Sequence, residues 1–595
     1  MIRTLSSLAL LVTILAGCDN RADVYLGAAT SGGSGGQAGG STGLCDPPRA
    51  SAQAVRVFLL PSAPANASTV FAAATCEPHG TDAAREPRII YPSNETKLPS
   101  NLSSIHFEWS SLPDDQLYQI EFRGPSSSVL VYTAEPHFEL GPDMWAAASA
   151  ARAPDRSIAV VVRALSRSDT TRVFESRPLT LYAGDALPSA SIYYWSTTAQ
   201  GIMRARFDAA VPAVRLVGSS PESQGCVGCH AVSSDGRRIA FDANSGHLQI
   251  EDLASLEPVL SSGTGGGGPG PGKMDKLGAE APAAWSAFSR DGTRMALASN
   301  GTLSVLDANG APLAPEKGTL TLPAKSIAAH PDWSPLGDRL VFTLGEKGGG
   351  RSVEKGQIAS VSFANDRLGP VEVLVPSEGP DDNNVFPSVS PDGKFVAFVN
   401  TRGKSYDSAN AELRLFRLSD ARVFPLPRLN SRVNDEDDLK ALGNSMPSWI
   451  STASGELWLS FSSLRAYATL RPANAKLDQI WMAAIDPELD DPAFAAFWAP
   501  FQHLAHGNHR AVWVAQNAPS SCGCQEICGD STDNDCDGSV DEPDCLDRCE
   551  TEETCGDGVD NDCDCVVDDC PEDCEDGVDN DGDGAIDAAD LLCKK

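Results

Sequence analysis

Two periodic patterns of apolar and polar residues predict β-structure over most of the chain. The first lies in residues 86–186, where 105–109 and 117–122 alternate apolar with polar positions and 157–164 and 179–182 do so more loosely. Turn residues separate these segments at short intervals, as in stacked antiparallel sheets. The pattern predicts a β-sandwich, with the tryptophan of the first segment in its core.

The second pattern is a polar turn followed by a short apolar strand, and it repeats between residues 188 and 516. The glycines of the five copies are 56, 45, 56 and 62 residues apart, namely Gly236, Gly292, Gly337, Gly393 and Gly455. Asp-Gly, present in three of these turns, favours a tight turn in which glycine has a positive φ. Spacings of this size suit one four-stranded sheet for each repeat.

These copies, of which Ser390-Pro-Asp-Gly393 is typical, resemble the WD40-like (PD40) repeats of TolB-type β-propellers. The resemblance implies a propeller whose ring is closed by pairing between the two ends of the repeat region. We expect six blades, with residues 192–207 supplying strands before the first copy and 511–514 supplying the closing strand. The preceding sandwich resembles a fibronectin type III or immunoglobulin-like module.

The N-terminus has the features of an export signal over residues 1–17. Arg3 precedes an apolar run too short to span a membrane, and Leu15-Ala-Gly-Cys18 follows it. This ending resembles a bacterial lipobox, which implies cleavage before Cys18 and lipidation of that cysteine; the alternative is an ordinary signal peptide. The expected location is the bacterial cell envelope, with the protein lipid-anchored and facing the periplasm or the cell surface.

Residues 18–85 combine a Gly/Ser-rich tether with a segment that contains Cys45 and Cys76. The chain has 17 cysteines, and an exported chain with so many favours disulfides over thiols. Cys45 and Cys76 are the only cysteines between Cys18 and Cys226, so we expect them to pair.

Charge is concentrated at the C-terminal end. The net charge is −34, and residues 522–595 contain 27 acidic and 3 basic residues. No basic patch is evident in the sequence, which argues against a nucleic-acid partner. An acidic, cysteine-rich tail indicates divalent cations instead.

The tail repeats a loop with aspartates at alternate positions and a glycine or cysteine at the sixth. Its candidate metal ligands are Asp533, Asp535, Asp537, Asp541 and Asp544, then Asp560, Asp562, Asp564 and Asp568, then Asp579, Asp581, Asp583, Asp587 and Asp590. The spacing matches EF-hand-like calcium loops, least well in the middle copy. The repeats also resemble those of MopE-type metal-binding proteins, a family that suggests copper. Hard oxygen ligands favour calcium.

Cys226-Val-Gly-Cys229-His230 matches the attachment signature of a c-type haem. Alignment of the repeats places Cys229 level with His330 and Met446, so either of these residues is a candidate second ligand to the iron. A Cys226–Cys229 disulfide, another metal, or no special role are the alternatives.

The expected fold class is all-β: a β-sandwich (86–186), a six-bladed TolB-like β-propeller (188–516) and a small Cys/Asp-rich calcium-loop tail (522–595). The expected function is that of a lipid-anchored envelope binding or scaffold protein. Its partners would be the membrane, through the lipid anchor, and an envelope protein or polymer. The alternative is an electron-transfer protein with one covalent haem c at the propeller mouth. No catalytic residues are assigned, and a hydrolase ranks last because the sequence has no credible serine elbow or His-Glu-x-x-His motif.

Overall fold

The structure is a computed structural model. It describes residues 54–515 except for 208–212, 219–226, 244–246, 254–257, 262–284, 300, 314–317, 350–351, 404, 406–407, 432–441 and 471–476. The described residues are almost entirely β-structure, which confirms the predicted all-β class, with two helices, α1 (Ala67–Ala73) and α2 (Pro142–Ala150). Neither helix has the length and apolar character needed to cross a membrane.

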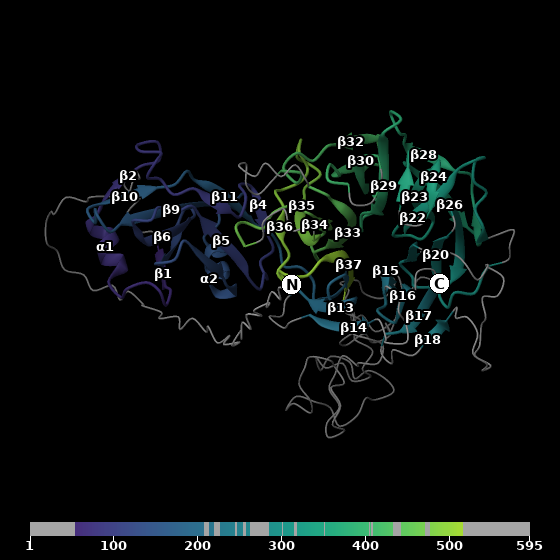
Figure 1. Cartoon of the computed structure of the whole chain (residues 1–595), viewed down its shortest axis with the longest axis horizontal. Coiled ribbons are helices and arrows are strands. Elements are labelled where there is room, and N and C mark those ends of the chain that lie inside the picture. Colours follow the sequence, from purple (N-terminus) through teal and green to yellow (C-terminus); the bar gives the residue numbers. More distant parts are fainter. Residues whose placement is uncertain are drawn as a thin grey trace, which may run out of the picture. The chain divides into compact units, whose positions relative to one another are not determined.

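The chain divides into two compact units (Figure 1). The first unit comprises residues up to 94 together with 104–183, and the second comprises 95–103 together with the residues from 184 onward. The predicted tail, 522–595, lies outside the described residues.

The first unit contains two sheets. The larger has the strand order β1 (Ala54–Leu59), β7 (Ser127–Thr133), β6 (Asp115–Arg123), β9 (Ser157–Ser166), β10 (Arg172–Glu175) and β2 (Thr75–Glu77), and β11 (Leu179–Ala183) also pairs with β9. The smaller has the order β3 (Ile89–Tyr91), β5 (Ile105–Trp109) and β8 (His137–Leu140).

Aromatic side chains of β5 pack on those of β6. The ring centroids of Phe107 and Phe122 lie 5.5 Å apart and those of Trp109 and Tyr118 lie 5.2 Å apart. Trp109 is buried, as its place in the alternating pattern predicts.

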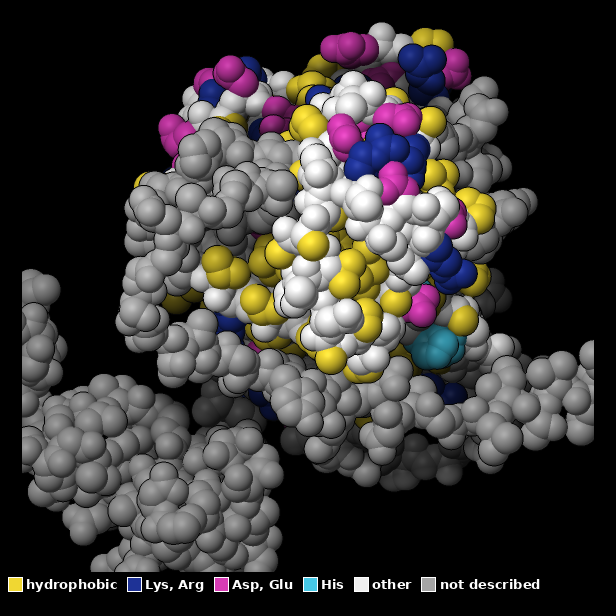
Figure 2. Space-filling model, turned by 90° about the vertical axis from the view of Figure 1, so that its left-hand side faces the viewer, with side chains coloured by type: hydrophobic (Ala, Val, Ile, Leu, Met, Phe, Trp, Pro, Cys, Tyr) yellow, Lys and Arg dark blue, Asp and Glu magenta, His cyan; other side chains and the backbone are white. Residues whose placement is uncertain are grey.

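On the face that Figure 2 shows, basic and acidic side chains lie intermixed around an area richer in hydrophobic side chains.

This unit begins earlier than the predicted boundary at residue 86. Strand β1 pairs with β7 and strand β2 pairs with β10, both in parallel. Cys76, in β2, is disulfide-bonded, and its predicted partner, Cys45, lies outside the described residues. The segment 54–77 therefore contributes strands to the larger sheet.

Within the described residues, the second unit contains six main antiparallel sheets. Their strand orders are β14 (Val214–Gly218), β13 (Gly201–Arg206), β12 (Ala190–Ser196), β37 (Asn508–Ala515); β15 (Val227–Val232), β16 (Arg238–Ala243), β17 (His247–Asp252), β18 (Pro258–Ser261); β19 (Trp285–Phe288), β20 (Arg294–Ser299), β21 (Thr302–Asp307); β22 (Ile327–Trp333), β23 (Arg339–Gly345), β26 (Gln357–Ala364), with β27 (Arg367–Leu368) and β28 (Glu372–Val375) both on β26; β29 (Asp382–Val389), β30 (Phe395–Arg402), β31 (Glu412–Arg417), β32 (Arg422–Phe424); and β33 (Ser445–Ser451), β34 (Leu457–Ser463), β35 (Gln479–Ile485), β36 (Phe497–Trp498). A short hairpin, β24 (Lys347–Gly349) with β25 (Ser352–Glu354), and strand β4 (Thr96–Leu98) complete the unit.

One edge strand of each sheet lies next to the corresponding strand of the following sheet. Contacts run from β15 to β19, β22, β29, β33 and β37 in turn, and β37 also contacts β15. Strand β37, near the end of the described chain and labelled in Figure 1, pairs antiparallel with β12, which lies at the beginning of the repeat region. The two ends of the repeat region are therefore joined in one sheet, as the sequence predicts.

The repeated turns follow from local hydrogen bonding. In three copies a serine hydroxyl donates to the aspartate of the same turn over 2.5 Å, in the pairs Ser233–Asp235, Ser289–Asp291 and Ser390–Asp392. The same serine oxygen accepts a hydrogen bond from the backbone N–H five residues later, which fixes the start of the next strand. All five turn glycines have φ between +64° and +84°, which confirms the predicted left-handed positions.

Candidate functional site

Five of the sheets share one backbone irregularity in the strand that faces its neighbours. A bulge occurs where the residue has a positive φ of 49° to 52°, and the five residues are Cys229, His330, Phe386, Met446 and Arg510. Residues other than glycine rarely adopt this conformation. Bulges change the direction of side chains and are common next to functional sites. The five bulge residues are therefore candidate site residues.

Proline follows three of these residues, as Pro331, Pro387 and Pro447. Proline has no N–H to contribute to a β-ladder and is therefore found in sheets at bulges or edges. In each case the strand register shifts across the residue pair that contains the proline. The sequence thus favours the bulge that positions the residue before each proline.

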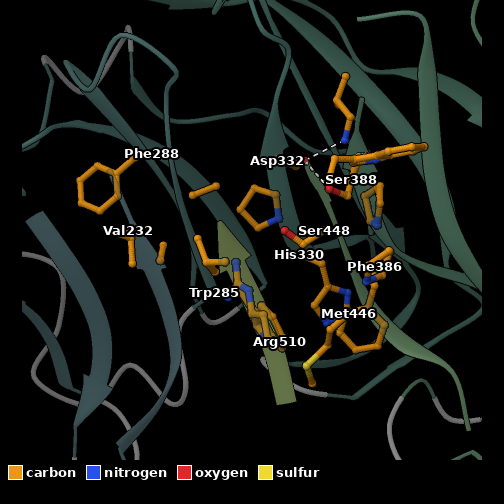
Figure 3. A pocket seen from close by; sticks show the side chains of 18 of the residues that line it. Val232, Trp285, Phe288, His330, Asp332, Phe386, Ser388, Met446, Ser448 and Arg510 are labelled. Carbon is orange, nitrogen blue, oxygen red and sulfur yellow. Dashed lines mark hydrogen bonds between the residues drawn. The ribbon is translucent and has the colours of Figure 1, made fainter. Parts of the chain in front are cut away.

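Four of the bulge residues line a single cavity of about 150 Å³ (Figure 3). They are His330, Phe386, Met446 and Arg510, and Trp285 joins them from β19. In the repeats, Trp285 and Phe386 occupy the positions equivalent to those of His330 and Met446. The structure brings these four side chains together; Cys229 and His230 are absent from the cavity lining.

The cavity has an aromatic cluster with a cation on it. The ring centroid of His330 lies 4.0 Å from that of Phe386 and 4.9 Å from that of Trp285. The guanidinium carbon of Arg510 lies 4.7 Å from the Trp285 ring centroid, within range of a cation–π interaction. Arg510 Nη2 also donates to the Ser286 carbonyl oxygen over 3.2 Å.

Burial dominates the electrostatics of this region. Desolvation, aided by the nearby Arg510 charge, lowers the pKa of His330 to about 3. His330 is therefore neutral at physiological pH. Desolvation also lowers the pKa of Arg510, although the nearby Cys229 and Asp332 oppose this shift. An arginine remains charged in proteins, so Arg510 carries a positive charge into the cavity.

Asp332 supplies the opposite charge on the lining. Burial raises the pKa of its carboxyl group. Its oxygens accept hydrogen bonds from the backbone N–H groups of Val389 at 2.8 Å and Trp333 at 3.0 Å, and from the Ser388 hydroxyl at 3.0 Å. These donors, rather than Arg510, hold the carboxylate.

His230 does not fit the role of a haem ligand in this structure. Its ring is fully buried, and its Nε2 lies 3.0 Å from the Tyr193 carbonyl oxygen, to which it must donate. An Nε2 that carries this proton has no lone pair for iron. The cavity is also smaller than the roughly 300–1,000 Å³ of ordinary ligand and cofactor sites.

The remaining predicted site residues lie outside the described residues. These are Cys18, Cys226 and the tail aspartates from Asp533 to Asp590. Among the residues that the structure does describe, no group of three or more His, Cys, Asp or Glu side chains is arranged to hold a metal ion.

Sequence reasoning missed Arg510 and Asp332. Arg510 lies three residues before Trp513, just as His330 and Met446 lie three residues before Trp333 and Trp449. That spacing was the available signal. It was hidden because β37 is not followed by the repeated turn, so the strand does not register as another copy.

Comparisons with solved structures find only distant similarity. A protein described as TolB from Agrobacterium tumefaciens matches with 14% identity and a TM-score of 0.30, over 55% of this chain and 99% of that one. Dihydro-heme d1 dehydrogenase NirN matches with 13% identity and a TM-score of 0.31, over 52% of this chain and 53% of its own length. A protein described as a 6-phosphogluconolactonase from Bacteroides uniformis matches with 15% identity and a TM-score of 0.31, over 53% of this chain and 85% of that one. No family model and no curated protein matches the chain.

Proposed function

We propose that the protein is a cell-envelope binding protein in which a β-sandwich precedes a six-bladed β-propeller. The packing of β5 on β6 supports the sandwich. Support for the propeller comes from six small sheets with neighbouring edge strands, together with the pairing of β37 with β12. This arrangement repeats one supersecondary unit around a centre, which is how propellers bury their sheet faces.

The binding site is the cavity lined by the propeller's inner strands. The observation that carries this proposal is the convergence of His330, Phe386, Met446 and Arg510, each on a left-handed bulge of a different sheet, on one cavity. Concave sites with apolar walls and a few placed polar groups are the usual form of ligand sites.

The rest of the proposal comes from the sequence. A lipid on Cys18 would hold the protein in the envelope, and calcium would stabilise the tail loops that include Asp533 and Asp579. The partner would be an envelope protein or polymer, because the acidic chain does not favour nucleic acid.

Cross-linked capture from a cell-envelope extract tests the function. Partly buried Ser448 lines the cavity, and Ser448→Trp would fill it, whereas exposed Ser419 does not line it, which makes Ser419→Trp a matched control. The partner should be captured by the wild type and by Ser419→Trp but not by Ser448→Trp.

A second arm of the experiment separates the cavity from the tail. Capture is repeated with excess calcium chelator. Capture that survives Ser448→Trp but is lost on chelation would assign binding to the tail and overturn the cavity as the site. Chelation should leave capture by the cavity intact.

A further inference from the structure

Three side chains on the cavity lining have buried polar atoms without hydrogen-bond partners. They are Arg510 Nη1, Trp285 Nε1 and His330 Nε2, and none has a partner among the residues that the structure describes. Buried polar atoms are nearly always hydrogen-bonded, and a cluster of exceptions on one cavity calls for an explanation.

Two of these atoms are hydrogen-bond donors in every protonation state relevant here. The guanidinium and the indole N–H can only donate. His330 Nδ1 lies 3.1 Å from the Thr343 hydroxyl oxygen. If that hydroxyl donates to Nδ1, neutral His330 carries its proton on Nε2 and adds a third donor. The group as a whole is therefore suited to an acceptor.

The positive charge of Arg510 favours an acceptor that is negatively charged. The Arg510 side chain donates to the neutral carbonyl of Ser286 and forms no ion pair within the described residues. Its Nη1 is buried without a partner among those residues, and burying part of a charged group is costly unless it is paired, so an anion at this position would compensate it. A guanidinium also matches the planar fork of a carboxylate.

We propose that the cavity binds a small monocarboxylate, with Arg510 as its charge partner and Trp285 and His330 as further donors. The inference rests on the proposed binding function and names the ligand class of the same cavity. The carboxylate would lie against the guanidinium, and its short apolar part would lie against Phe386 and Met446, which supply apolar walls.

The size and charge of the cavity limit the ligand. A cavity of about 150 Å³ has room for a molecule of about the size of benzene. Arg290, Arg510 and Asp332 give the lining two positive charges and one negative charge, so one further negative charge balances it. A short-chain monocarboxylate therefore fits better than a dicarboxylate or a phosphate.

Isothermal titration calorimetry of the full-length protein with propionate tests the inference. Propionamide has nearly the same shape without the charge and serves as the ligand control. Propionate should bind saturably, propionamide and phosphate should not, and Arg510→Gln should weaken propionate binding roughly ten- to a hundredfold. Arg417→Gln is the matched protein control, because Arg417 is ion-paired with Asp420 and does not line the cavity.

Several results would overturn the inference. One is the absence of saturable heat from propionate in the millimolar range with the wild type, which needs no variant to fold. Equal binding of propionate and propionamide, or equal loss in Arg417→Gln and Arg510→Gln, would also do so. Partner capture that depends on Ser448 without propionate binding would leave the binding function standing and remove only the carboxylate.

Discussion

Each unit has an arginine with a buried guanidinium nitrogen, and the two arginines differ in their partners. In the first unit, Arg163 is fully buried and forms ion pairs with Glu121 at 2.9 Å and with Glu175 at 2.7 Å. It also donates to Gln119 over 2.6 Å. In the second unit, Arg510 faces a backbone carbonyl and an aromatic ring.

The difference distinguishes an arginine that stabilises the fold from an arginine that is available to bind a ligand. Removing one member of a buried set of ion pairs leaves the opposite charges without that partner. Arg163 therefore stabilises the first unit. Arg510 forms no ion pair within the described residues, and the buried Asp332 carboxylate, which acts on it only at longer range, keeps its own hydrogen-bond donors when Arg510 is removed. A guanidinium with a buried nitrogen and no ion pair among the described residues is therefore the better indicator of a ligand.

The largest effect should follow from Arg163→Met. The substitution keeps much of the side-chain volume but leaves Glu175 without this guanidinium and Glu121 with the one of Arg123, 2.9 Å away, which should destabilise the first unit by about 3–5 kcal/mol. Scanning calorimetry of the full-length protein would show the corresponding transition at a lower temperature. Replacing both glutamates as well should recover part of the loss; a loss below about 1 kcal/mol for Arg163→Met alone would contradict the assignment.

A drop in pH should have the next largest effect, and in the second unit. Burial, with the Arg510 charge second, lowers the pKa of both His230 and His330 to about 3 in the folded protein. Their unfolded pKa is about 6.5, so only the unfolded state takes up protons between these values. Stability is thus fully present above about pH 6.5 and is lost as the pH falls toward 3, on the order of 2 kcal/mol for each histidine at pH 5.

Calorimetry at pH 7.5 and pH 5 would measure this loss in the wild type and in His330→Gln. The variant lacks one of three buried histidines with a lowered pKa, His230, His330 and His509, and should show a smaller drop between the two pH values. His137→Gln, at an exposed position in the first unit, is the control. An equal drop in His330→Gln and the wild type would show that His330 does not cause the dependence.

The smallest effect on stability should come from Arg510→Met. The change removes a hydrogen bond to Ser286 and the contact with Trp285, but it also removes a partly buried charge that has no ion pair within the described residues, so the net change should be within about 1 kcal/mol. The unfolding temperature of the second unit would measure it. Destabilisation comparable to that of Arg163→Met would show that Arg510 also stabilises the fold, and the two arginines would then not differ in role.

The fold was predictable where the pattern was local. The alternation in residues 105–109 matches β5 (Ile105–Trp109), and the turn glycines, such as Gly393, have the expected positive φ. Strands β1 and β2 were missed because they are short and pair in parallel with β7 and β10, more than 70 residues away in sequence. Non-local pairing of this kind leaves no signature in a short window of sequence.

The candidate site was predictable only in part for the same reason. Repeat alignment identified His330 and Met446, because each precedes a recognisable turn. It could not show that His230 turns its Nε2 to a carbonyl of β12, a strand about 40 residues earlier. Nor could it identify Arg510, whose relation to Trp285 exists only after β37 has joined the sheet of β12.

The position of Arg510 on β37 has a consequence for the order of assembly. Ribosomal synthesis delivers β12 first and β37 more than 300 residues later, so the first sheet waits for its inner strand until the rest of the repeat region has emerged. The same strand brings Arg510, which lines the cavity together with Arg290. A nascent or truncated chain that lacks β37 therefore lacks both the strand that completes the sheet of β12 and the guanidinium of Arg510, so the full set of cavity donors exists only once β37 has paired.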